Sequence, residues 1–281
     1  MNRRRLADEP TSRLAIWARR IAVFSLVATF LSIIIVRAGL LEIWPALATF
    51  AGALALAVAA IVLAVGAFVV IWREGYGGLG HAILAVIIGL ALLAYPSYLG
   101  IKAYRLPAIA DITTDPLDPP RFEAIARLRG RDSNPVVYAG LYAAEQQREA
   151  YPEVEPLIVT GTPESAYNAA LSVITKRKWR IVDARAPQAG RRDGHIEAVA
   201  RTPIMGFRDD VVVRVRSTGD STRIDVRSAS RYGQHDFGTN AARIRSLIDD
   251  IDDYIGNEKL ERPPTPQKAS QPAKRGQPAR R

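Results

Sequence analysis

The sequence predicts an α-helical membrane anchor of three transmembrane helices followed by an α+β domain, in which two helices pack on an antiparallel sheet of four to five strands. Residues 21–101 contain three apolar stretches, residues after 156 contain short segments of alternating polarity, and two amphipathic segments flank them. We therefore divide the chain into a basic cytoplasmic N-terminus (1–20), a transmembrane region (21–101), an extracytoplasmic α+β domain (111–256) and a disordered, basic, proline-rich tail (257–281).

The net charge of +10 is concentrated at the two ends of the chain. Residues 1–20 carry +4 and residues 257–281 carry +5, whereas residues 111–256 carry −1. A domain that binds nucleic acid needs a basic surface, so we expect no nucleic acid as a partner. The absence of cysteine excludes disulfides, cysteine nucleophiles and thiolate metal sites.

The three apolar stretches differ in length. Residues 43–72 run without a charge and exceed the ~20 residues that a helix needs to cross the hydrocarbon core. Residues 75–101 are also long enough, while residues 21–36 need help from residues 38–41, with Arg37 extending its charge to the interface. The "GYGGLG" segment (75–80) matches a dinucleotide-binding pattern, but it joins two spans and follows no strand, so we interpret it as a turn.

The distribution of basic residues predicts the orientation. With the N-terminus inside, seven Lys and Arg residues lie near the cytoplasmic side, and Arg37, Lys102 and Arg105 lie outside. We therefore predict a multi-pass protein of the inner (plasma) membrane with a periplasmic or extracytoplasmic C-terminal domain. A signal peptide is the alternative for the first stretch, but two further spans follow it directly.

The second stretch presents small residues at four-residue spacing, Ala53 with Ala57 and Ala60 with Ala64. Such a face lets a neighbouring helix approach closely, so other membrane proteins are candidate partners beside the lipid bilayer itself. The alternative is that alanine is simply common here. The spans contain no acidic residue, which argues against an ion or proton pathway.

The domain begins with "DITTDPLDPPRF" (111–122), an extended segment that leads away from the bilayer. A short strand at 157–161 precedes a helix that Thr162 caps and Pro163 begins. Four strands follow at 179–185, 195–201, 211–217 and 222–230, with a tight turn at 218–221. A final helix at 240–255 places on one stripe Ile244, Leu247, Ile248, Ile251 and Ile255.

Four acidic residues crowd the C-terminal half of the final helix: Asp249, Asp250, Asp252 and Asp253. The helix dipole disfavours negative charge there, so we expect a positive group nearby, from domain arginines or the basic tail. A solvated acidic face is the alternative. The tail itself carries charge that suits anionic lipid or polymer.

The alternation of the strands divides the sheet into two faces. The set expected to meet the helices is Ile196, Ala198, Ala200, Val211, Val213, Val215, Ile224 and Val226. The opposite set is His195, Glu197, Arg201, Asp210, Arg214, Arg216, Arg223, Asp225 and Arg227. One interpretation of this charged set is a solvated face of cross-strand ion pairs. The other is a surface for anionic lipid headgroups or an envelope polymer, with the candidate binding residues Arg201, Arg214, Arg216, Arg227 and Arg231.

Two adjacent carboxylates, Asp209 and Asp210, precede the strand at 211–217. If the strand register extends back over them, Asp209 points to the helix-covered side and Asp210 to the arginine side, so they cannot share a proton as a catalytic dyad. We expect Asp209 to be paired by backbone N–H groups or by Arg201 or Arg231, and Asp210 to lie on a screened outer face.

Three segments carry a resemblance to a known family: "DITTDPLDPPRF", "IEAVARTPIMGFRDDVVVRV" and "TRIDVRSASRYGQHDFGTNAARIRSLI". They resemble the bacterial membrane-associated family of domain of unknown function 1499, over roughly residues 111–255. The family has no established activity, so the resemblance implies no reaction. It implies matches to family motifs at Arg201, Phe207, Asp209, Asp210, Arg227, Ser228, Ser230, Arg231, Gly233, Asp236, Gly238 and Asn240.

Motifs for catalysis are sparse. The chain has no G-x-S-x-G, H-E-x-x-H or Walker motif, and a metal site from His195, His235 and Asp236 lacks a motif spacing, so we expect no cofactor and no metal. We therefore favour a binding or scaffolding module of the cell envelope. The alternative is a membrane-anchored hydrolase that uses the "GFRDD" and "GQHDFG" loops, with Asp209, His235 and Asp236 as candidate catalytic residues.

Overall fold

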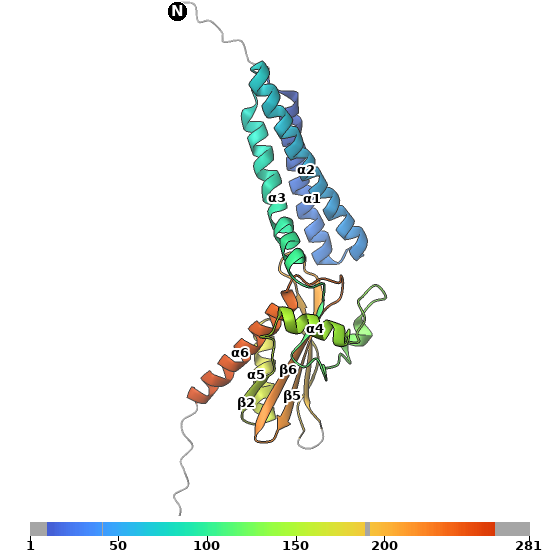
Figure 1. The fold of residues 1–281 in the computed structure, drawn as a ribbon, viewed down its shortest axis with the longest axis vertical. Coiled ribbons are helices and arrows are strands. Elements are labelled where there is room, and N and C mark those ends of the chain that lie inside the picture. The colour runs from blue at the N-terminus through green and yellow to red at the C-terminus, as the bar shows by residue number, and fades with distance from the viewer. Residues whose placement is uncertain (1–9, 41, 189–191, 262–281) are drawn as a thin grey trace, which may run out of the picture.

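The computed structural model describes residues 10–40, 42–188 and 192–261. Figure 1 shows a bundle of three long helices at one end and a sheet flanked by helices at the other. The predicted fold class, a helical membrane anchor followed by an α+β domain, is confirmed. The first part of the basic N-terminus (1–9) and the predicted disordered tail from residue 262 onward lie outside the described residues.

The membrane helices are α1 (Arg13–Ala38), α2 (Ile43–Glu74) and α3 (Leu79–Arg105), and each is long and apolar enough to cross a membrane. α1 begins well before the span predicted from residue 21, because the residues that precede the span include good helix formers such as Arg19 and Arg20. The glycine-rich segment is a turn as predicted: α2 ends at Gly75 in the left-handed conformation, with φ 69°.

Aromatic side chains mark both ends of the bundle. Trp17 and Trp72 are exposed at the end far from the domain, and Trp44 and Tyr98 are exposed at the end near it. At 1.5 Å per residue, α2 rises ~42 Å between Trp44 and Trp72, which matches a bilayer with its interfacial regions. Aromatic rings at both interfaces are typical of a transmembrane bundle.

Small side chains fill the contacts between the three helices. The buried cluster consists of Ala15, Ala18, Ala22, Ala60, Ala64, Ala67, Ala82 and Ala85. Ser25 Oγ donates a hydrogen bond to the carbonyl of Ala53 at 2.8 Å, and a Cβ on Gly89 would lie 2.6 Å from Ile61 Cγ1. The chain's own α1 and α3 therefore cover the small-residue face of α2, and the prediction that this face binds other membrane proteins is wrong.

The domain is built on one antiparallel sheet with strand order β1-β6-β5-β4-β3, and β2 also pairs with β6. The strands are β1 (Asp111–Thr113), β2 (Leu157–Thr160), β3 (Arg180–Arg185), β4 (Gly194–Arg201), β5 (Arg208–Thr218) and β6 (Ser221–Ser230). The five predicted strands are present. β1 was missed: the segment expected only to lead away from the bilayer begins as an edge strand, with Asp111 opposite Ala229.

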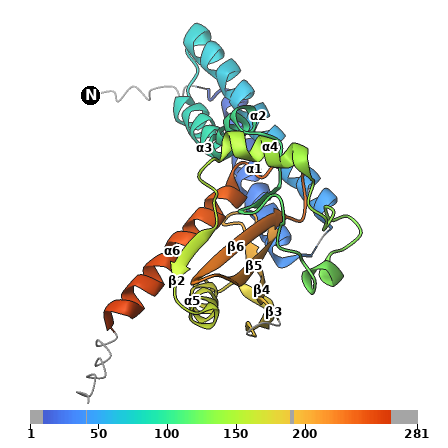
Figure 2. The same ribbon diagram turned by 60° about the horizontal axis from the view of Figure 1, so that its bottom comes forward.

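One face of the sheet packs against α5 (Pro163–Lys176) and α6 (Thr239–Glu261), which run beside the strands in Figure 2. Thr162 caps α5 as predicted, since its hydroxyl accepts a hydrogen bond from Ser165 N–H at 3.2 Å. All eight residues predicted to point inward from β4, β5 and β6 are at most 2% exposed, so the register is confirmed. α6 runs past residue 256, so the residues up to Glu261 are helical rather than part of a tail.

The charged face of the sheet is covered as well. Residues 114–140 fold back over it, with the short helix η1 (Ile125–Leu128) inside this segment and α4 (Leu141–Ala150) directly after it. The apolar contacts are made by Phe122, Ile125, Val199, Val212 and Ala229. Glu197, Asp210 and Asp225 are fully buried, so the expectation of a solvated face is wrong.

The acidic residues of α6 have a positive neighbour, as expected. Arg177, which follows α5, places Nη2 2.6 Å from Asp250 Oδ2, and its guanidinium lies over the ring of Trp179. An arginine of the domain thus offsets part of the charge that the helix dipole disfavours.

Candidate binding site

Two loops at the membrane end of the sheet, here called the motif loops, contain residues that the family resemblance singles out: Phe207, Gly233, Asp236 and Gly238. The β4–β5 loop (202–207) is closed by Thr202, whose N–H donates to the carbonyl of Phe207 and whose hydroxyl accepts from Phe207 N–H, both at 2.9 Å. Gly206 adopts φ 70°, and a Cβ there would lie 3.1 Å from Arg37 Cγ. Glycine therefore allows the loop to pack closely on α1.

Arg37, at the end of α1, ties the bundle to this loop. Its Nη1 donates hydrogen bonds to the carbonyls of Pro203 and Ile204 at 2.5 and 2.9 Å. In return, Arg201 Nη1 donates to the carbonyl of Arg37 at 3.4 Å. The side chain that the sequence assigned to the membrane interface thus contacts the domain.

The β6–α6 loop (231–238) contacts the end of α3 through His235. Its Nδ1 accepts a hydrogen bond from Phe237 N–H at 2.9 Å, and its Nε2 lies 3.1 Å from the carbonyl of Leu106. When Nδ1 accepts from this amide, Nε2 is the nitrogen that donates to the carbonyl of Leu106. Both nitrogens are therefore engaged.

Asp236 organises the start of α6. Its Oδ1 accepts from Gly238 N–H at 2.9 Å and its Oδ2 from Asn240 N–H at 2.7 Å. Burial raises the pKa of Asp236, and these backbone donors oppose that effect. Both oxygens of this carboxylate thus bind backbone N–H groups where the loop meets α6.

The two loops and the bundle enclose a cavity of about 420 Å³, a size typical of small-molecule sites. The membrane helices contribute Ile43, Trp44 and Leu47 on α2 and Tyr95 and Leu99 on α3. The domain contributes residues of both loops, among them Ile204, Met205, Phe207, Tyr232 and Phe237. The cavity therefore lies where the ends of α2 and α3 meet the domain, and its lining is mostly apolar.

The candidate catalytic residues Asp209, His235 and Asp236 all line this cavity. The structure brings them to one place, but their polar atoms are engaged elsewhere. Asp209 Oδ2 lies 2.5 Å from Arg243 Nη2, while His235 and Asp236 make the loop contacts described above. Burial raises the pKa of Asp209, and Arg243 opposes this rise. This arrangement holds the loops together, and it leaves none of the three poised on a shared point.

The Asp209 and Asp210 side chains diverge, as the register predicts. Asp209 faces α6 and pairs with Arg243, whereas Asp210 faces the covered side and accepts from Arg129 Nε at 2.8 Å and Arg231 Nη2 at 2.8 Å. The prediction that Arg201 or Arg231 pairs with Asp209 is therefore wrong: Arg243 binds Asp209, and Arg231 binds Asp210. Asp210 is not on a screened outer face, because the 114–140 segment brings Arg129 over it.

Arg214 and Arg216 face carboxylates from the covering segment. Asp115 Oδ2 accepts from Arg216 at 2.8 Å, and Asp118 Oδ2 accepts from Arg214 at 2.9 Å. Asp225, on β6, also accepts from Arg214. Arg214 is the main cause that lowers the pKa of Asp118. Binding of an external anion by these two arginines would have to displace those carboxylates.

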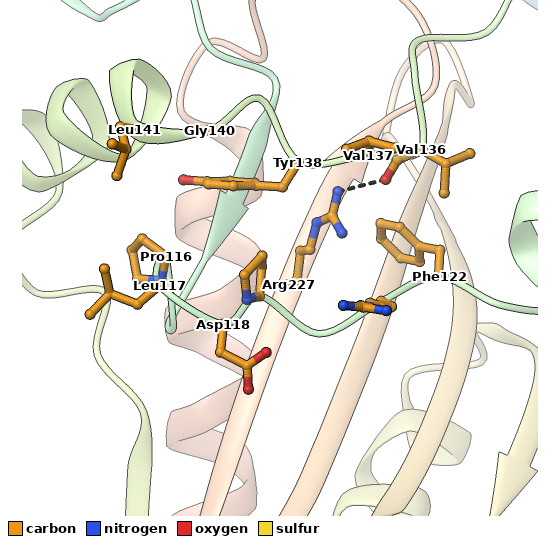
Figure 3. Close-up of a pocket in the computed structure, with 12 residues that line it drawn as sticks. Pro116, Leu117, Asp118, Phe122, Val136, Val137, Tyr138, Gly140, Leu141 and Arg227 are labelled. Atoms are coloured by element: carbon orange, nitrogen blue, oxygen red, sulfur yellow. Dashed lines mark hydrogen bonds between the residues drawn. The ribbon is translucent and has the colours of Figure 1, made fainter.

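Arg227 is buried and lines a second cavity, of about 590 Å³ (Figure 3). Its Nε and Nη2 donate to the two oxygens of Asp111 at 2.9 and 2.6 Å, and Nη2 also donates to the carbonyl of Val136. Its guanidinium lies over Phe122 at 4.7 Å and Tyr138 at 5.6 Å. These contacts fasten the covering segment to the sheet.

The metal combination considered from the sequence is not brought together. His195 lies at the start of β4, and His235 lies beyond the opposite end of the sheet. Instead, Asp183, His195 and Glu197 place ligand atoms within 4.8 Å of one another. Glu197 is already saturated with donors, which leaves little reason for a cation there.

The donors to Glu197 come from the covering segment. Its carboxylate accepts the backbone N–H groups of Glu123, Ala124 and Ile125 at 2.7 to 3.0 Å, and His195 Nε2 at 2.9 Å. Burial alone would raise the pKa of Glu197, but His195 and the three N–H groups together lower it to about 2. Glu197 thus anchors η1 to β4.

Sequence reasoning missed two of the pairing arginines. Arg243 had a detectable signal, because it lies four residues before Leu247 and so falls beside the apolar stripe of the final helix. Arg129 lies in a segment without periodicity, and nothing in its local sequence assigns it to Asp210. The cavity residues of α2 and α3 had no signal beyond their membrane location.

The fold and the site define a class: an integral membrane protein whose α+β domain joins its transmembrane helices around a ligand-sized cavity. Residues 111–251 match the family model described as Protein of unknown function (DUF1499), and the chain belongs to this family. The match covers the sheet, α5 and most of α6, and it includes both loops that line the cavity. No curated protein matches the chain.

The buried carboxylates give a stability prediction. Asp210→Ala leaves Arg129 and Arg231 buried without their anion, so the domain should lose ~3–5 kcal/mol of its free energy of unfolding. Asp209→Ala should cost a similar amount because it strands Arg243. The exposed Asp249→Ala is the control and should change stability by less than ~0.5 kcal/mol. Urea unfolding of the intact protein in detergent measures all three, and a loss below ~1 kcal/mol for Asp210→Ala would contradict this packing.

The Glu197 contacts predict a pH dependence. The folded pKa is lowered from 4.5 to about 2, so the stabilisation by Glu197 is fully present above pH 4.5 and is lost as pH falls through about 2. Glu197→Gln lacks this titration. Between pH 4.5 and pH 2, the free energy of unfolding of the wild type should therefore fall by about 3 kcal/mol more than that of Glu197→Gln. The exposed Glu145→Gln should keep the wild-type slope. Equal slopes in all three proteins would refute the role of Glu197.

Proposed function

We propose that the protein is a membrane-anchored binding or scaffolding module of the cell envelope, and that the junction cavity binds an amphiphilic ligand. One observation carries this proposal: transmembrane helices and both motif loops build the walls of the same cavity. A ligand there contacts the anchor and the domain at once.

The position of the cavity supports an amphiphile. Trp44 and Tyr95 line it and are also substantially exposed at the domain end of the bundle, as aromatic side chains at a membrane interface are. The lining combines aliphatic and aromatic surface with a few polar groups, such as Arg208 and Gln234. A lipid, with an apolar acyl chain and a polar headgroup, has apolar and polar parts that match this lining.

The hydrolase alternative uses the same cavity. It requires a free general base, and His235 has both ring nitrogens engaged by Leu106 and Phe237. Binding needs no such rearrangement, which is why we prefer it. Turnover of an ester-linked lipid that is abolished in His235→Ala would favour the hydrolase instead.

We further propose that the domain is extracytoplasmic in the inner membrane. The basic residues of the described helix ends support this orientation. The end far from the domain carries Arg13, Arg19, Arg20 and Arg73, and the domain end carries Arg37, Lys102 and Arg105.

Filling the cavity tests the binding proposal. Leu99→Trp adds an indole to the cavity wall, so the number of lipids that the intact protein retains in native mass spectrometry should fall, with a loss of affinity of about tenfold, or ~1.4 kcal/mol. Leu90→Trp is the matched control, because Leu90 lies on the same helix and is 57% exposed to the bilayer. Equal lipid retention in both variants and the wild type would rule out the cavity as the site.

A fusion experiment tests the orientation. Alkaline phosphatase fused after Glu261 should be active, and a fluorescent protein fused at the same position should be dark, because only the former matures outside the cytoplasm. The same two reporters fused after Gly75, in the loop between α2 and α3, form the control and should give the opposite pattern. An inactive phosphatase fusion and a fluorescent protein fusion that fluoresces, both after Glu261, would place the domain in the cytoplasm.

A further inference from the structure

Two arginines lie opposite each other at the membrane end of the sheet. Arg201, the last residue of β4, and Arg208, the first residue of β5, are register partners in the antiparallel pair. Directly opposed residues place their Cβ atoms ~4.5–5.5 Å apart on one face, and like charges in such positions repel. Both arginines are exposed.

The two carboxylates that follow Arg208 in sequence, Asp209 and Asp210, already form ion pairs with other arginines. Asp209 binds Arg243, and Asp210 binds Arg129 and Arg231. Within the described part of the chain, neither Arg201 nor Arg208 has an ion-pair partner within 4.0 Å. The Arg201 guanidinium donates a hydrogen bond to the carbonyl of Arg37, itself an arginine at the junction.

The other arginine cluster on this face is neutralised by carboxylates of the chain itself. Arg214, Arg216 and Arg223 lie together on neighbouring strands, and Asp115, Asp118 and Asp225 supply matching negative charge. The protein thus neutralises an arginine cluster near the β5–β6 turn with its own carboxylates. At the membrane end it leaves the opposed pair open, beside the third arginine, Arg37.

Arg208 also lines the junction cavity. Because Arg201 is the register partner of Arg208, the positive pair adjoins the apolar space. Arginine binds phosphate oxygens through two parallel N–H donors, and an anion between two opposed arginines removes their repulsion.

We propose that Arg201 and Arg208 bind the phosphate of an anionic phospholipid whose acyl chain occupies the junction cavity. This inference rests on the proposed function and specifies its ligand. The bilayer is the source of the ligand, because the cavity lies between the membrane helices and the domain. The arginine pair selects headgroup charge, and the cavity supplies affinity for the chain.

The test compares two lipids on the intact protein in detergent, measured by native mass spectrometry. Phosphatidylglycerol and phosphatidylcholine with identical acyl chains differ in net charge, so the wild type should prefer phosphatidylglycerol by about tenfold, or ~1.4 kcal/mol. Arg201→Gln/Arg208→Gln should reduce this preference to near one, because phosphatidylglycerol, whose phosphate charge no choline offsets, loses more affinity than phosphatidylcholine does. Arg201→Lys/Arg208→Lys keeps the charge but not the planar fork, and it should retain part of the preference.

A double variant with the same loss of charge provides the control. Arg127→Gln/Arg192→Gln removes two exposed arginines, one in η1 and one before β4 at the opposite end of the sheet, and should keep the wild-type preference. An unchanged preference in Arg201→Gln/Arg208→Gln overturns the inference while leaving cavity binding intact. A wild type that retains neither lipid, and matches Leu99→Trp, overturns the proposed function itself. Inorganic phosphate that binds the wild type as tightly as phosphatidylglycerol overturns the lipid as the source of the phosphate.

Discussion

The hydrogen bonds from Arg37 to the β4–β5 loop determine where the domain sits on its anchor. A guanidinium at the end of α1 binds the carbonyls of Pro203 and Ile204, and the glycine at 206 lets the loop approach the helix closely enough for this contact. His235 makes the corresponding contact to the end of α3. These attachments place the motif loops against the bundle, and the space between them is the junction cavity. Because the loops are also the ends of β4 and β6, the position of the whole sheet follows from them.

A second constraint acts on the sheet itself, since both of its faces are covered. A charged residue on a buried face must find an internal partner or lose its charge, and the segment 114–140 supplies those partners. Glu197 accepts backbone N–H groups of this segment, Asp210 binds Arg129, and Arg227 donates to the carbonyl of Val136. Residues that look like a functional charged surface are therefore mostly structural. Arg201 and Arg208 differ because they lie exposed at the membrane end of the sheet.

Much of the fold was predictable because it follows from local patterns. The apolar stretches gave α1 to α3, and strict alternation gave β3 to β6 and the correct inward set. β1 and α4 were missed because a three-residue edge strand and a polar ten-residue helix carry no strong period. The covering of the charged face could not be predicted, because contacts such as Arg129 with Asp210 join positions 81 residues apart without a motif. The divergence of Asp209 and Asp210 was predictable from strand geometry alone, but the identity of their partners was not. The cavity depends on the placement of the bundle against the domain, which no local pattern encodes.

Disulfide trapping of the junction tests the central claim, that the domain packs on the end of the bundle, most directly. The chain has no native cysteine, and a Cβ on Gly206 would lie 3.6 Å from Arg37 Cβ, within the range of a disulfide. Arg37→Cys/Gly206→Cys loses the Arg37 hydrogen bonds but keeps the contact of His235 with Leu106, so it should still crosslink under mild oxidation in native membranes. Arg37→Cys/Gly219→Cys is the control, because Gly219 also has a positive φ but lies in the β5–β6 turn. Efficient crosslinking of the first pair and none of the second is the result that this structure predicts, whereas no crosslink in the first pair, or equal crosslinking in both, would contradict it.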